Sequence, residues 1–342
     1  MDGMDSMDGM DNMDASQSGA SRLRPATGDR LPDTGITRLA PSPTGALHLG
    51  NLRTFLANYI LAAQRGWKVL MRIEDIDGPR IKPAAAEGVL EELAWLGLKW
   101  DQPVVWQSRR LGEYASALAH LVSAGLAYPC VCSRKDAQTA SAAPHAEDGA
   151  SAYPGTCRGV YASAADAAER SGGRAVAWRV KVEPGEIEVP DRFAGPRGFD
   201  LTRTCGDFVI YRAEGLPAYQ LAVVVDDAAA GVDAIVRGDD LLESAARQIH
   251  LRRLLGLSPE PAYWHLPLVV GPDGRRLAKR HGDTRLAAYR RAGATPQRVL
   301  GLLAAWLGAL DHPREIDMDE LIGLFDIDRV PRGQVGFTGA DD

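Results

Sequence analysis

The sequence lacks an apolar run of the roughly 18 residues that a membrane-spanning helix needs. Its N-terminus lacks both a basic start and an apolar segment, so we expect no secretory signal. Cysteine is scarce, with four in 342 residues, and in a chain without a secretory signal clustered cysteines favour metal binding over disulfides. These absences predict a cytoplasmic protein that does not associate with membranes.

An excess of basic residues is also missing. Lys and Arg number 39 against 45 Asp and Glu, and the formal net charge of −6 argues against a non-specific nucleic-acid binder. The total still allows a local basic face, although for any one basic pair the alternative is ordinary solvated surface. The candidate pairs are Arg109-Arg110, Arg275-Arg276, Lys279-Arg280 and Arg290-Arg291.

The first 35 residues differ in composition from the rest of the chain. They repeat Met-Asp with small residues and hold too little apolar surface for a core, so residues 1–35 are predicted to be a disordered tail. The remaining length is enough for two domains, or for one large domain with an insertion. A hydrophobic content of 45% is typical of a globular protein, and no internal repeat is present.

The segment from Arg38 to Asn51 predicts a short strand, a proline-containing turn and a helix that begins at His48. Apolar residues at helical spacing support this helix: Leu52, Phe55, Leu56, Tyr59 and Ile60. A helix start carries unpaired N–H groups and partial positive charge, and Gly50 lets a phosphate approach the backbone. His48 can donate to a phosphate oxygen, so the segment predicts a nucleotide phosphate site.

Strands and helices alternate after this segment. Residues 67–74 predict a buried strand that ends in polar residues, and Pro83 marks the first turn of a helix. This order implies a parallel sheet with right-handed crossovers, in which ligands bind at the strand carboxyl ends, where Ser42 and Glu74 fall. The pattern further predicts strands at 207–212 and 232–237 and helices at about 240–255, 284–292, 296–307 and 318–325. Thr295 and Asp317 are the predicted N-caps of the last two helices.

A basic loop from Gly274 to Gly282 lies near the other end of the chain. Such a loop can place Lys279 on phosphates that carry extra charge in a transition state. Together with the segment around His48, it resembles the two signature motifs of class I aminoacyl-tRNA synthetases, His-Ile-Gly-His and Lys-Met-Ser-Lys-Ser. Two residues depart from the second motif, since Arg276 and Ala278 replace its first Lys and its Ser.

The longer string Ala40-Pro-Ser-Pro-Thr-Gly-x-Leu-His-x-Gly50 resembles the glutamyl/glutaminyl subgroup of these enzymes, in which an Asn at position 51 in place of the second His is usual. The resemblance implies a Rossmann-like α/β catalytic domain in which His48 and Lys279 are catalytic. It also implies that magnesium accompanies the ATP. The implied ATP-binding residues are Thr44, His48, Gly50, Asn51 and Lys279.

An amino-acid substrate needs an anion for its ammonium group and cations or donors for its carboxylates. The resemblance implies that Glu74 takes the ammonium group of glutamate, while Arg38, Tyr219 and Arg237 take carboxylates. The full implied glutamate site is Arg38, Leu39, Ala40, Pro41, Ser42, Glu74, Tyr219 and Arg237.

Each of these residues also has a purely structural alternative. Glu74 or Asp75 could pair with Arg72 or Arg80, and Tyr219 could be a core residue. Because the same chain also carries the phosphate motifs, the binding interpretation is favoured over these alternatives.

Three of the four cysteines cluster in sequence, as Cys130, Cys132 and Cys157. A Cys-x-Cys turn can present two thiolates to one tetrahedral zinc ion. On chemistry alone His145 is the better fourth ligand, because the phenol of Tyr153 must first lose a proton. The alternative to a metal site is a set of ordinary buried thiols. Cys205 is predicted to be a core residue.

The spacing Tyr-x-x-x-Cys after Cys-x-Cys resembles one group within the family, the glutamyl-queuosine tRNA(Asp) synthetases, and by that resemblance Tyr153 is the fourth zinc ligand. Val223 stands where discriminating glutamyl enzymes tend to have Asn. About 60 residues follow Gly282, too few for a helical anticodon-binding region, so we expect a free-standing catalytic core. By this resemblance the partners are ATP, L-glutamate and tRNA(Asp) carrying queuosine, and the chain is expected to be a monomer.

The expected domain organisation has five parts. They are a tail (1–35), the first half of the catalytic domain (36–125), a zinc-binding insertion (126–195), the second half of the catalytic domain (196–282) and a short helical part (283–342). The implied reaction forms glutamyl-adenylate and then moves glutamate to a hydroxyl of the queuosine cyclopentenediol at the wobble position. Alternatives are a truncated glutamyl-tRNA synthetase that charges the tRNA 3′ end, a catalytically silent tRNA-binding paralog, or another nucleotidyltransferase of this fold.

Overall fold

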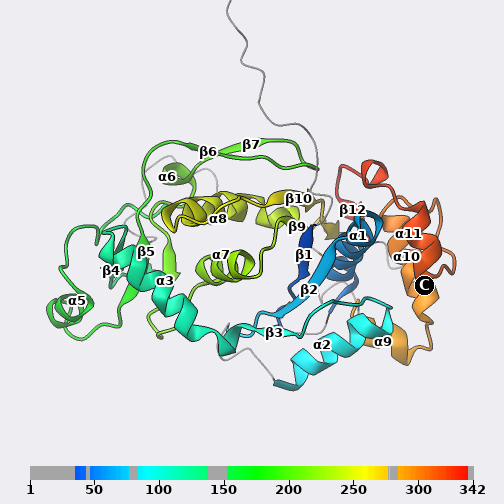
Figure 1. Cartoon of the computed structure of the whole chain (residues 1–342), viewed down its shortest axis with the longest axis horizontal. Helices are drawn as coiled ribbons and strands as arrows, with labels where there is room; N and C mark the ends of the chain where they lie inside the picture. Colours follow the sequence, from blue (N-terminus) through cyan, green and yellow to red (C-terminus); the bar gives the residue numbers. More distant parts are fainter. Residues whose placement is uncertain are drawn as a thin grey trace, which may run out of the picture. The chain divides into compact units, whose positions relative to one another are not determined.

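The computed structural model describes residues 35–43, 47–76, 83–133, 135–137, 152–275, 277 and 284–337 (Figure 1). The predicted tail lies outside these residues, apart from its last residue.

Three short parallel strands form the sheet that the alternation of strand and helix predicts. They are β1 (Ile36–Leu39), β2 (Lys68–Ile73) and β3 (Val105–Trp106), and β2 pairs with both of the others. Helix α1 (Leu49–Arg65) connects β1 to β2, and α2 (Pro83–Trp95) lies between β2 and β3. The predicted parallel sheet with helical crossovers is therefore confirmed.

Helix α1 buries its predicted apolar face and is fixed to β1 by polar contacts. Leu52, Leu56 and Ile60 are each at most 1% exposed. The Asn58 amide accepts from the Thr37 hydroxyl (2.8 Å) and donates to the Arg38 carbonyl (3.0 Å), so helix and strand are held in one register. Because this contact fixes the helix, it also fixes the position of the helix start beside the end of β1.

A second parallel pair continues the fold beside β1. It consists of β9 (Ala234–Gly238) and β10 (Ala262–Leu266). The Asp233 N–H donates to the Ile36 carbonyl (3.0 Å), and the Asp233 carboxylate accepts from the Ile36 N–H (2.8 Å). The strands β1, β2 and β9 therefore run next to one another, with their carboxyl ends on one side. Helices α7 (Tyr219–Ala229) and α8 (Leu242–Leu254) pack together.

An antiparallel part has its sheet on the far side of α7 from α1 (Figure 1). Its sheet consists of β4 (Ala127–Cys130), β5 (Ala177–Val180) and β8 (Val209–Tyr211), and it follows α3 (Leu111–Ser123). The other elements of this part are α5 (Ala164–Arg170), the hairpin of β6 (Glu186–Val189) and β7 (Arg197–Asp200), and α6 (Leu201–Thr204).

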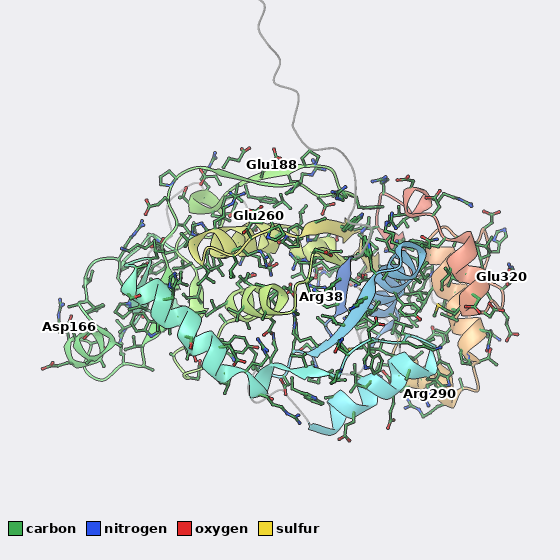
Figure 2. The ribbon with its side chains drawn as sticks, in the orientation of Figure 1. Arg38, Asp166, Glu188, Glu260, Arg290 and Glu320 are labelled. Carbon is green, nitrogen blue, oxygen red and sulfur yellow. The ribbon has the colours of Figure 1, made fainter. Side chains whose placement is uncertain are left out.

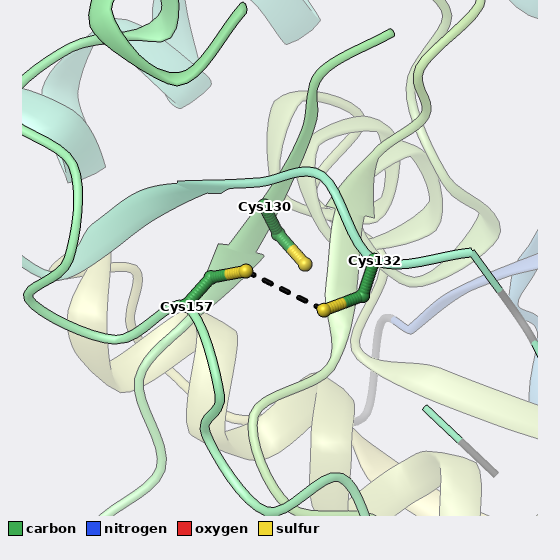
Figure 3. A group of neighbouring side chains, drawn as sticks. All are labelled: Cys130, Cys132 and Cys157. Atoms are coloured by element: carbon green, nitrogen blue, oxygen red, sulfur yellow. Dashed lines mark hydrogen bonds between the residues drawn. The ribbon is translucent and has the colours of Figure 1, made fainter. Parts of the chain in front are cut away.

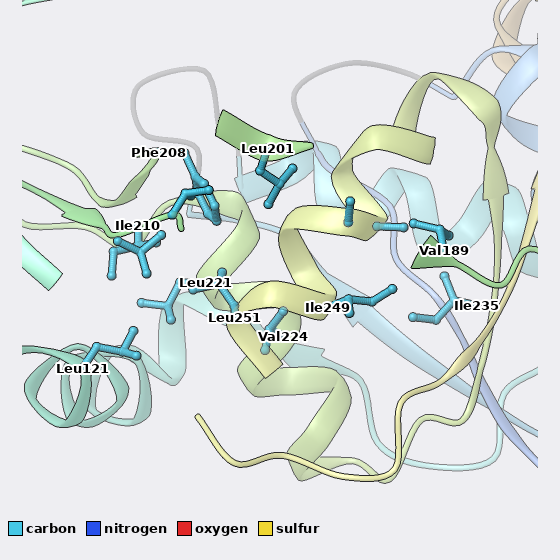
Figure 4. Packing of buried hydrophobic residues seen from close by; sticks show 14 of the residues in the cluster. Leu121, Val189, Leu201, Phe208, Ile210, Leu221, Val224, Ile235, Ile249 and Leu251 are labelled. Atoms are coloured by element: carbon cyan, nitrogen blue, oxygen red, sulfur yellow. The ribbon is translucent and has the colours of Figure 1, made fainter. Parts of the chain in front are cut away.

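One apolar cluster joins the antiparallel part to α7 and α8 (Figure 4). Leu121 from α3, Ile210 from β8 and Leu221 from α7 are each fully buried in it. Ile249 and Leu251 from α8 close the cluster. Because elements from both sides share this core, the antiparallel sheet is held rigidly against the helices that line the strand ends.

The last third of the fold is mainly helical, as predicted. It contains β11 (Val269–Val270), α9 (Leu286–Arg291), α10 (Pro296–Trp306), α11 (Met318–Leu324) and β12 (Val335–Gly336). The predicted N-caps are confirmed, because the Thr295 and Asp317 side chains accept from the N–H groups three residues on. No helix in the described part of the chain has the length and apolar run of a membrane-spanning segment.

Arg53 of α1 anchors this helical part, and we expect its replacement by Leu to lower the free energy of unfolding by about 2–4 kcal/mol. Its side chain is fully buried, and it donates to the carbonyls of Trp306 (3.0 Å) and Pro267 (2.7 Å). Arg53→Leu leaves both carbonyls without their donor. Urea unfolding measures the loss, with the exposed Arg298→Ala in α10 as control; equal stability of the two variants would contradict the assignment.

Candidate functional site

A cavity of about 540 Å³ lies at the carboxyl ends of β1, β2 and β9. It brings together most of the residues predicted for the ATP and glutamate sites. The predicted residues that line it are Arg38, Ala40, Ser42, His48, Gly50, Asn51, Glu74, Tyr219 and Arg237.

Of the predicted site residues that the structure describes, Leu39 and Pro41 do not line this cavity. Leu39 is fully buried, and Pro41 uses its carbonyl to accept the Glu74 N–H (3.1 Å). Thr44 and Lys279 fall outside the described residues. The roles of all these residues stay predictions.

The start of α1 forms one wall of the cavity. His48 is the N-cap residue, and its carbonyl accepts from the N–H groups of Asn51 (2.9 Å) and Leu52 (3.1 Å). A Cβ atom at position 50 would lie 3.4 Å from the His48 ring, so Gly50 leaves the ring and the backbone room to meet a ligand together. The helix dipole adds partial positive charge at this wall.

The basic loop predicted to carry Lys279 is attached to the same wall at both ends. The Leu277 N–H donates to the carbonyl of Val269 (2.9 Å), which itself lines the cavity. On the other side, the Thr284 carbonyl accepts from the Leu49 N–H, and the Leu286 N–H donates to the Leu47 carbonyl, both at 3.0 Å. Residues that flank the second signature segment, more than 200 residues away in sequence, therefore lie at the start of α1.

A buried ionic network forms the opposite wall. Arg72, 4% exposed, hydrogen-bonds Asp227 and contacts Glu74 at 3.2 Å, while Arg38 lies 3.4 Å from Asp227. The pairing of Glu74 with Arg72 is the structural alternative noted from the sequence, and it occurs while Glu74 also lines the cavity. In Figure 2, Arg38 lies in the interior beside β1, whereas Asp166 and Glu320 lie at the periphery.

Burial raises the pKa of the Glu74 carboxyl above its ordinary value, although the charges of Arg72 and Arg38 act in the opposite direction. A cation brought into the cavity would favour the ionised form. Asp75, the other carboxylate of this segment, instead accepts from the Ser108 N–H (2.8 Å) and hydroxyl (2.6 Å). It therefore has a local structural role.

Sequence reasoning missed several residues of the cavity and its supports. Gln107 and Arg212 line the cavity, but Arg212 follows a strand of the antiparallel sheet, so the rule for parallel strands that found Glu74 does not apply to it. Asp227 comes from α7, inside an apolar sequence with no binding motif. Tyr219, the first residue of that helix, is 37% exposed and lines the cavity, so it is not a core residue.

A second cluster of reactive side chains lies in the antiparallel part (Figure 3). The sulfur atoms of Cys130, Cys132 and Cys157 all lie within 4.8 Å of one another, and Cys132 and Cys157 approach to 3.4 Å. A tetrahedral zinc ion with Zn–S bonds of about 2.3 Å would separate its sulfur ligands by about 3.8 Å. The three thiols therefore fit a metal ion, while Cys205 bonds the Leu201 carbonyl outside the cluster.

The Tyr153 hydroxyl completes this cluster. It lies 3.5 Å from the sulfur of Cys130 and 3.4 Å from that of Cys132, and it accepts the Cys157 N–H at 3.0 Å. The competing ligand, His145, falls outside the described residues. Sequence reasoning missed Arg179, whose guanidinium lies 3.6 Å from the centre of the Tyr153 ring.

The thiols and the phenol differ in acidity. Burial acts to raise the pKa of Cys157, but hydrogen bonds from the Val131 backbone and from Tyr153 outweigh it and lower that pKa. Burial raises the pKa of the Tyr153 phenol, and the neighbouring thiols add to the effect. A bound divalent cation reverses this preference, because it stabilises a coordinated anion directly.

The chain matches a known family over most of its length. Residues 36–334 match the family model of the catalytic domain of class I tRNA synthetases (E and Q). A glutamyl-Q tRNA(Asp) synthetase of Symbiobacterium thermophilum is 47% identical over 306 residues, which cover 87% of this chain and 94% of that protein. A protein of the same name from Nocardia farcinica is 49% identical over 302 residues, which cover 87% of this chain and 91% of that protein.

Solved structures of related enzymes have the same fold. A glutamate tRNA ligase from Elizabethkingia meningosepticum is 26% identical with a TM-score of 0.75, and the match covers 90% of this chain and 68% of that one. The glutamate-tRNA synthetase of Elizabethkingia anophelis is also 26% identical, with a TM-score of 0.76. This match covers 90% of this chain and 69% of that one. By family match and by sequence identity, this chain belongs to the class I tRNA synthetases for glutamate and glutamine, in the group of glutamyl-Q tRNA(Asp) synthetases.

Proposed function

We propose that this enzyme activates L-glutamate with ATP to give glutamyl-adenylate and then transfers glutamate to the queuosine cyclopentenediol at the wobble position of tRNA(Asp). The observation that carries the proposal is the single cavity that holds the start of α1 on one side and the Glu74–Arg38–Arg237 set on the other. The relatives named glutamyl-Q tRNA(Asp) synthetase, at 47–49% identity, support the choice of acceptor.

The two sides of the cavity suit the two substrates of the first step. The α1 start offers the Gly50 N–H, His48 and partial positive charge to the phosphates of ATP. Glu74 offers a carboxylate to the ammonium group of glutamate, and Arg237 and Arg38 offer donors to its carboxylates. One glutamate carboxylate oxygen then attacks the α-phosphorus, and pyrophosphate leaves. Positioning and charge stabilisation carry this step, with magnesium screening the phosphates.

Lys279 is proposed as the second catalytic group, with Thr44 as a further ATP contact. The anchoring of Leu277 and Thr284 at the start of α1 supports this role, because Lys279 is only two residues from the first anchor. In the second step a hydroxyl of the cyclopentenediol attacks the acyl carbon of the adenylate, and AMP leaves. A splayed-out anticodon base would enter the cavity for this step.

We further propose a structural zinc ion held by Cys130, Cys132, Cys157 and Tyr153. The fit of the three sulfur atoms and the phenol oxygen to one tetrahedron supports it. Such an ion would tie the end of β4 to the loop that contains Cys157. The division into catalytic halves (36–125 and 196–282), insertion (126–195) and helical part (283–342) is likewise proposed, as is the monomeric state.

The proposed function is tested by two assays on the full chain. Glutamate-dependent ATP–pyrophosphate exchange is expected without tRNA. Labelled glutamate is then expected on tRNA(Asp) that carries queuosine, including tRNA from which the 3′-terminal adenosine has been removed, and not on tRNA(Asp) with guanosine at the wobble position. If ATP–pyrophosphate exchange occurs only after tRNA(Glu) is added, and transfer needs the tRNA 3′ end, the enzyme is instead a glutamyl-tRNA synthetase. If neither assay shows activity, the chain is an inactive paralog.

Glu74→Gln is expected to raise the KM for glutamate by about tenfold or more, because a neutral amide loses the charged contact with the ammonium group. The KM for ATP should change little. Burial raises the pKa of Glu74, so the wild type should lose glutamate binding as the pH falls through that raised pKa. This loss at low pH, the acid limb of the pH profile, should be absent from the variant. Asp75→Asn is the matched control, and an unchanged acid limb in Glu74→Gln would contradict the assignment.

Cys157→Ser is expected to weaken zinc binding by about 100-fold and to lower the thermal midpoint, because one thiolate ligand is lost. Zinc content per chain is measured by atomic emission after dialysis against a weak chelator. Cys205→Ser is the control, since that thiol lies outside the cluster. A wild type without zinc, or a Cys157→Ser variant with full zinc, would rule out the metal centre.

A further inference from the structure

A buried chain of polar groups lies behind Arg237, on the side away from the cavity. The Arg237 Nε–H donates to the Nε2 atom of His265 (2.9 Å), and the His265 Nδ1 atom lies 2.6 Å from an Asp191 carboxylate oxygen. The exposed fractions of the three residues are 5%, 1% and 4%. They come from β9, from β10 and from the segment after β6, so the chain links the antiparallel part to the cavity.

The protonation of this chain follows from its hydrogen bonds. A guanidinium group can only donate, so the Nε2 atom of His265 must present its lone pair to Arg237. The imidazole proton is then on Nδ1, where it is donated to Asp191. Burial lowers the pKa of His265, with the charge of Arg237 acting in the same direction, so the ring stays neutral.

Asp191 is itself held in place by the backbone. Its carboxylate accepts from the N–H groups of Phe193 (2.9 Å), Ala194 (2.5 Å) and His265 (3.1 Å) in addition to the imidazole. An acceptor with this many donors has one orientation. The orientation of the imidazole ring, and through it that of the arginine, is therefore set by a rigid backbone turn.

Two further hydrogen bonds hold the guanidinium group of Arg237. Its terminal nitrogens donate to the Gln248 side chain (2.9 Å) and to the Leu241 carbonyl (3.2 Å), and Gln248 is fixed in turn by Gln220 (2.9 Å). Within the described part of the chain, three of the five N–H groups of Arg237 thus have protein acceptors. One N–H on each terminal nitrogen is left for a carboxylate in the cavity.

All three of these acceptors of Arg237 are neutral, which distinguishes it from Arg72 and Arg38. Arg72 contacts three carboxylates, those of Asp227, Glu74 and Asp226, and Arg38 contacts Asp227. A carboxylate at the Nε position would orient Arg237 equally well, but it would cancel the charge that a substrate carboxylate needs. A neutral imidazole orients the guanidinium and leaves its charge to the ligand.

We propose that His265, oriented by Asp191, is the positioning residue that aims Arg237 at a carboxylate of glutamate. The proposal rests on the proposed function, since it names the residue that prepares the glutamate side of that cavity. His265 does not touch the substrate in this arrangement and acts only through Arg237.

Two neutral variants separate positioning from packing. The Gln side chain in His265→Gln places an amide oxygen near the site of Nε2 and keeps an acceptor for Arg237. The shorter Asn side chain in His265→Asn reaches only as far as Nδ1, so it can still bond Asp191 but loses Arg237. We expect His265→Asn to raise the KM for glutamate about tenfold with kcat and the KM for ATP nearly unchanged, and His265→Gln to stay within about twofold of the wild type.

The matched control is His250→Asn. His250 is another histidine whose ring is hydrogen-bonded, here to the Lys181 carbonyl (2.8 Å), and it lies on α8 away from the cavity. We expect that variant to lose stability without any change in the KM for glutamate. A parallel rise in KM for His265→Asn, His265→Gln and His250→Asn, or no rise in any, would overturn the proposal.

A second readout does not depend on activity. In wild-type protein with 15N-labelled histidine, the His265 signal, assigned by its loss in His265→Gln, should show a protonated Nδ1 and an unprotonated Nε2. A protonated Nε2 would overturn the proposal even if the enzyme is active. If the wild type shows the expected tautomer but no glutamate-dependent ATP–pyrophosphate exchange, the proposed function is wrong and the arrangement of His265 and Arg237 still stands.

Discussion

Arg72 is a cation buried between β2 and α7, and the charged wall of the cavity depends on the carboxylates that neutralise it. A buried ion that loses its partner is strongly destabilising, so Asp226 and Asp227 must stay beside Arg72. Asp226 also accepts from Gln107 (2.8 Å), and the Tyr114 hydroxyl lies 2.9 Å from it. One acidic pair on α7 thereby fixes that helix against β2, the turn after β3 and α3.

The same constraint divides the arginines of the site by function. Arg72, surrounded by carboxylates, is a structural cation, and it does not line the cavity. Arg237 and Arg38 do line it, and the acceptors of Arg237 among the described residues are all neutral. A cavity-lining cation that keeps its charge favours a ligand with a second carboxylate over one with an amide, because burying an uncompensated guanidinium is costly. In the proposed function, the neutral acceptors behind the arginine are therefore what would select glutamate over glutamine.

The sequence predicted the parts of this molecule that local chemistry determines. The turn and helix at His48, the Thr295 and Asp317 caps, the parallel order of β1 and β2 and the thiol cluster all follow from spacing within about thirty residues. It also placed Glu74 at a strand end, where a ligand site of a parallel sheet belongs.

What the sequence did not predict are contacts between distant residues that carry no motif. Asp191 and His265 are 74 residues apart, and each alone has the appearance of an ordinary polar residue in a loop or strand. Arg179 likewise sits on β5 with nothing in its neighbours to indicate Tyr153. The pairing of Asp191 with His265 arises only when the antiparallel part is folded against β9 and β10, and that of Arg179 with Tyr153 only when the antiparallel part itself folds, so no local pattern encodes them.

The position of Tyr153 shows how such tertiary contacts turn a common residue into a potential ligand. Its N–H donates to the Cys205 carbonyl (3.0 Å), and a Cβ atom at position 206 would lie 2.2 Å from the Tyr153 carbonyl oxygen, so only Gly206 allows this approach. On the other side the Arg179 guanidinium covers the ring and its Nε–H donates to the Cys130 sulfur (3.3 Å). The phenol oxygen is thus directed at the three sulfur atoms by backbone packing and by a residue that no ligand motif contains.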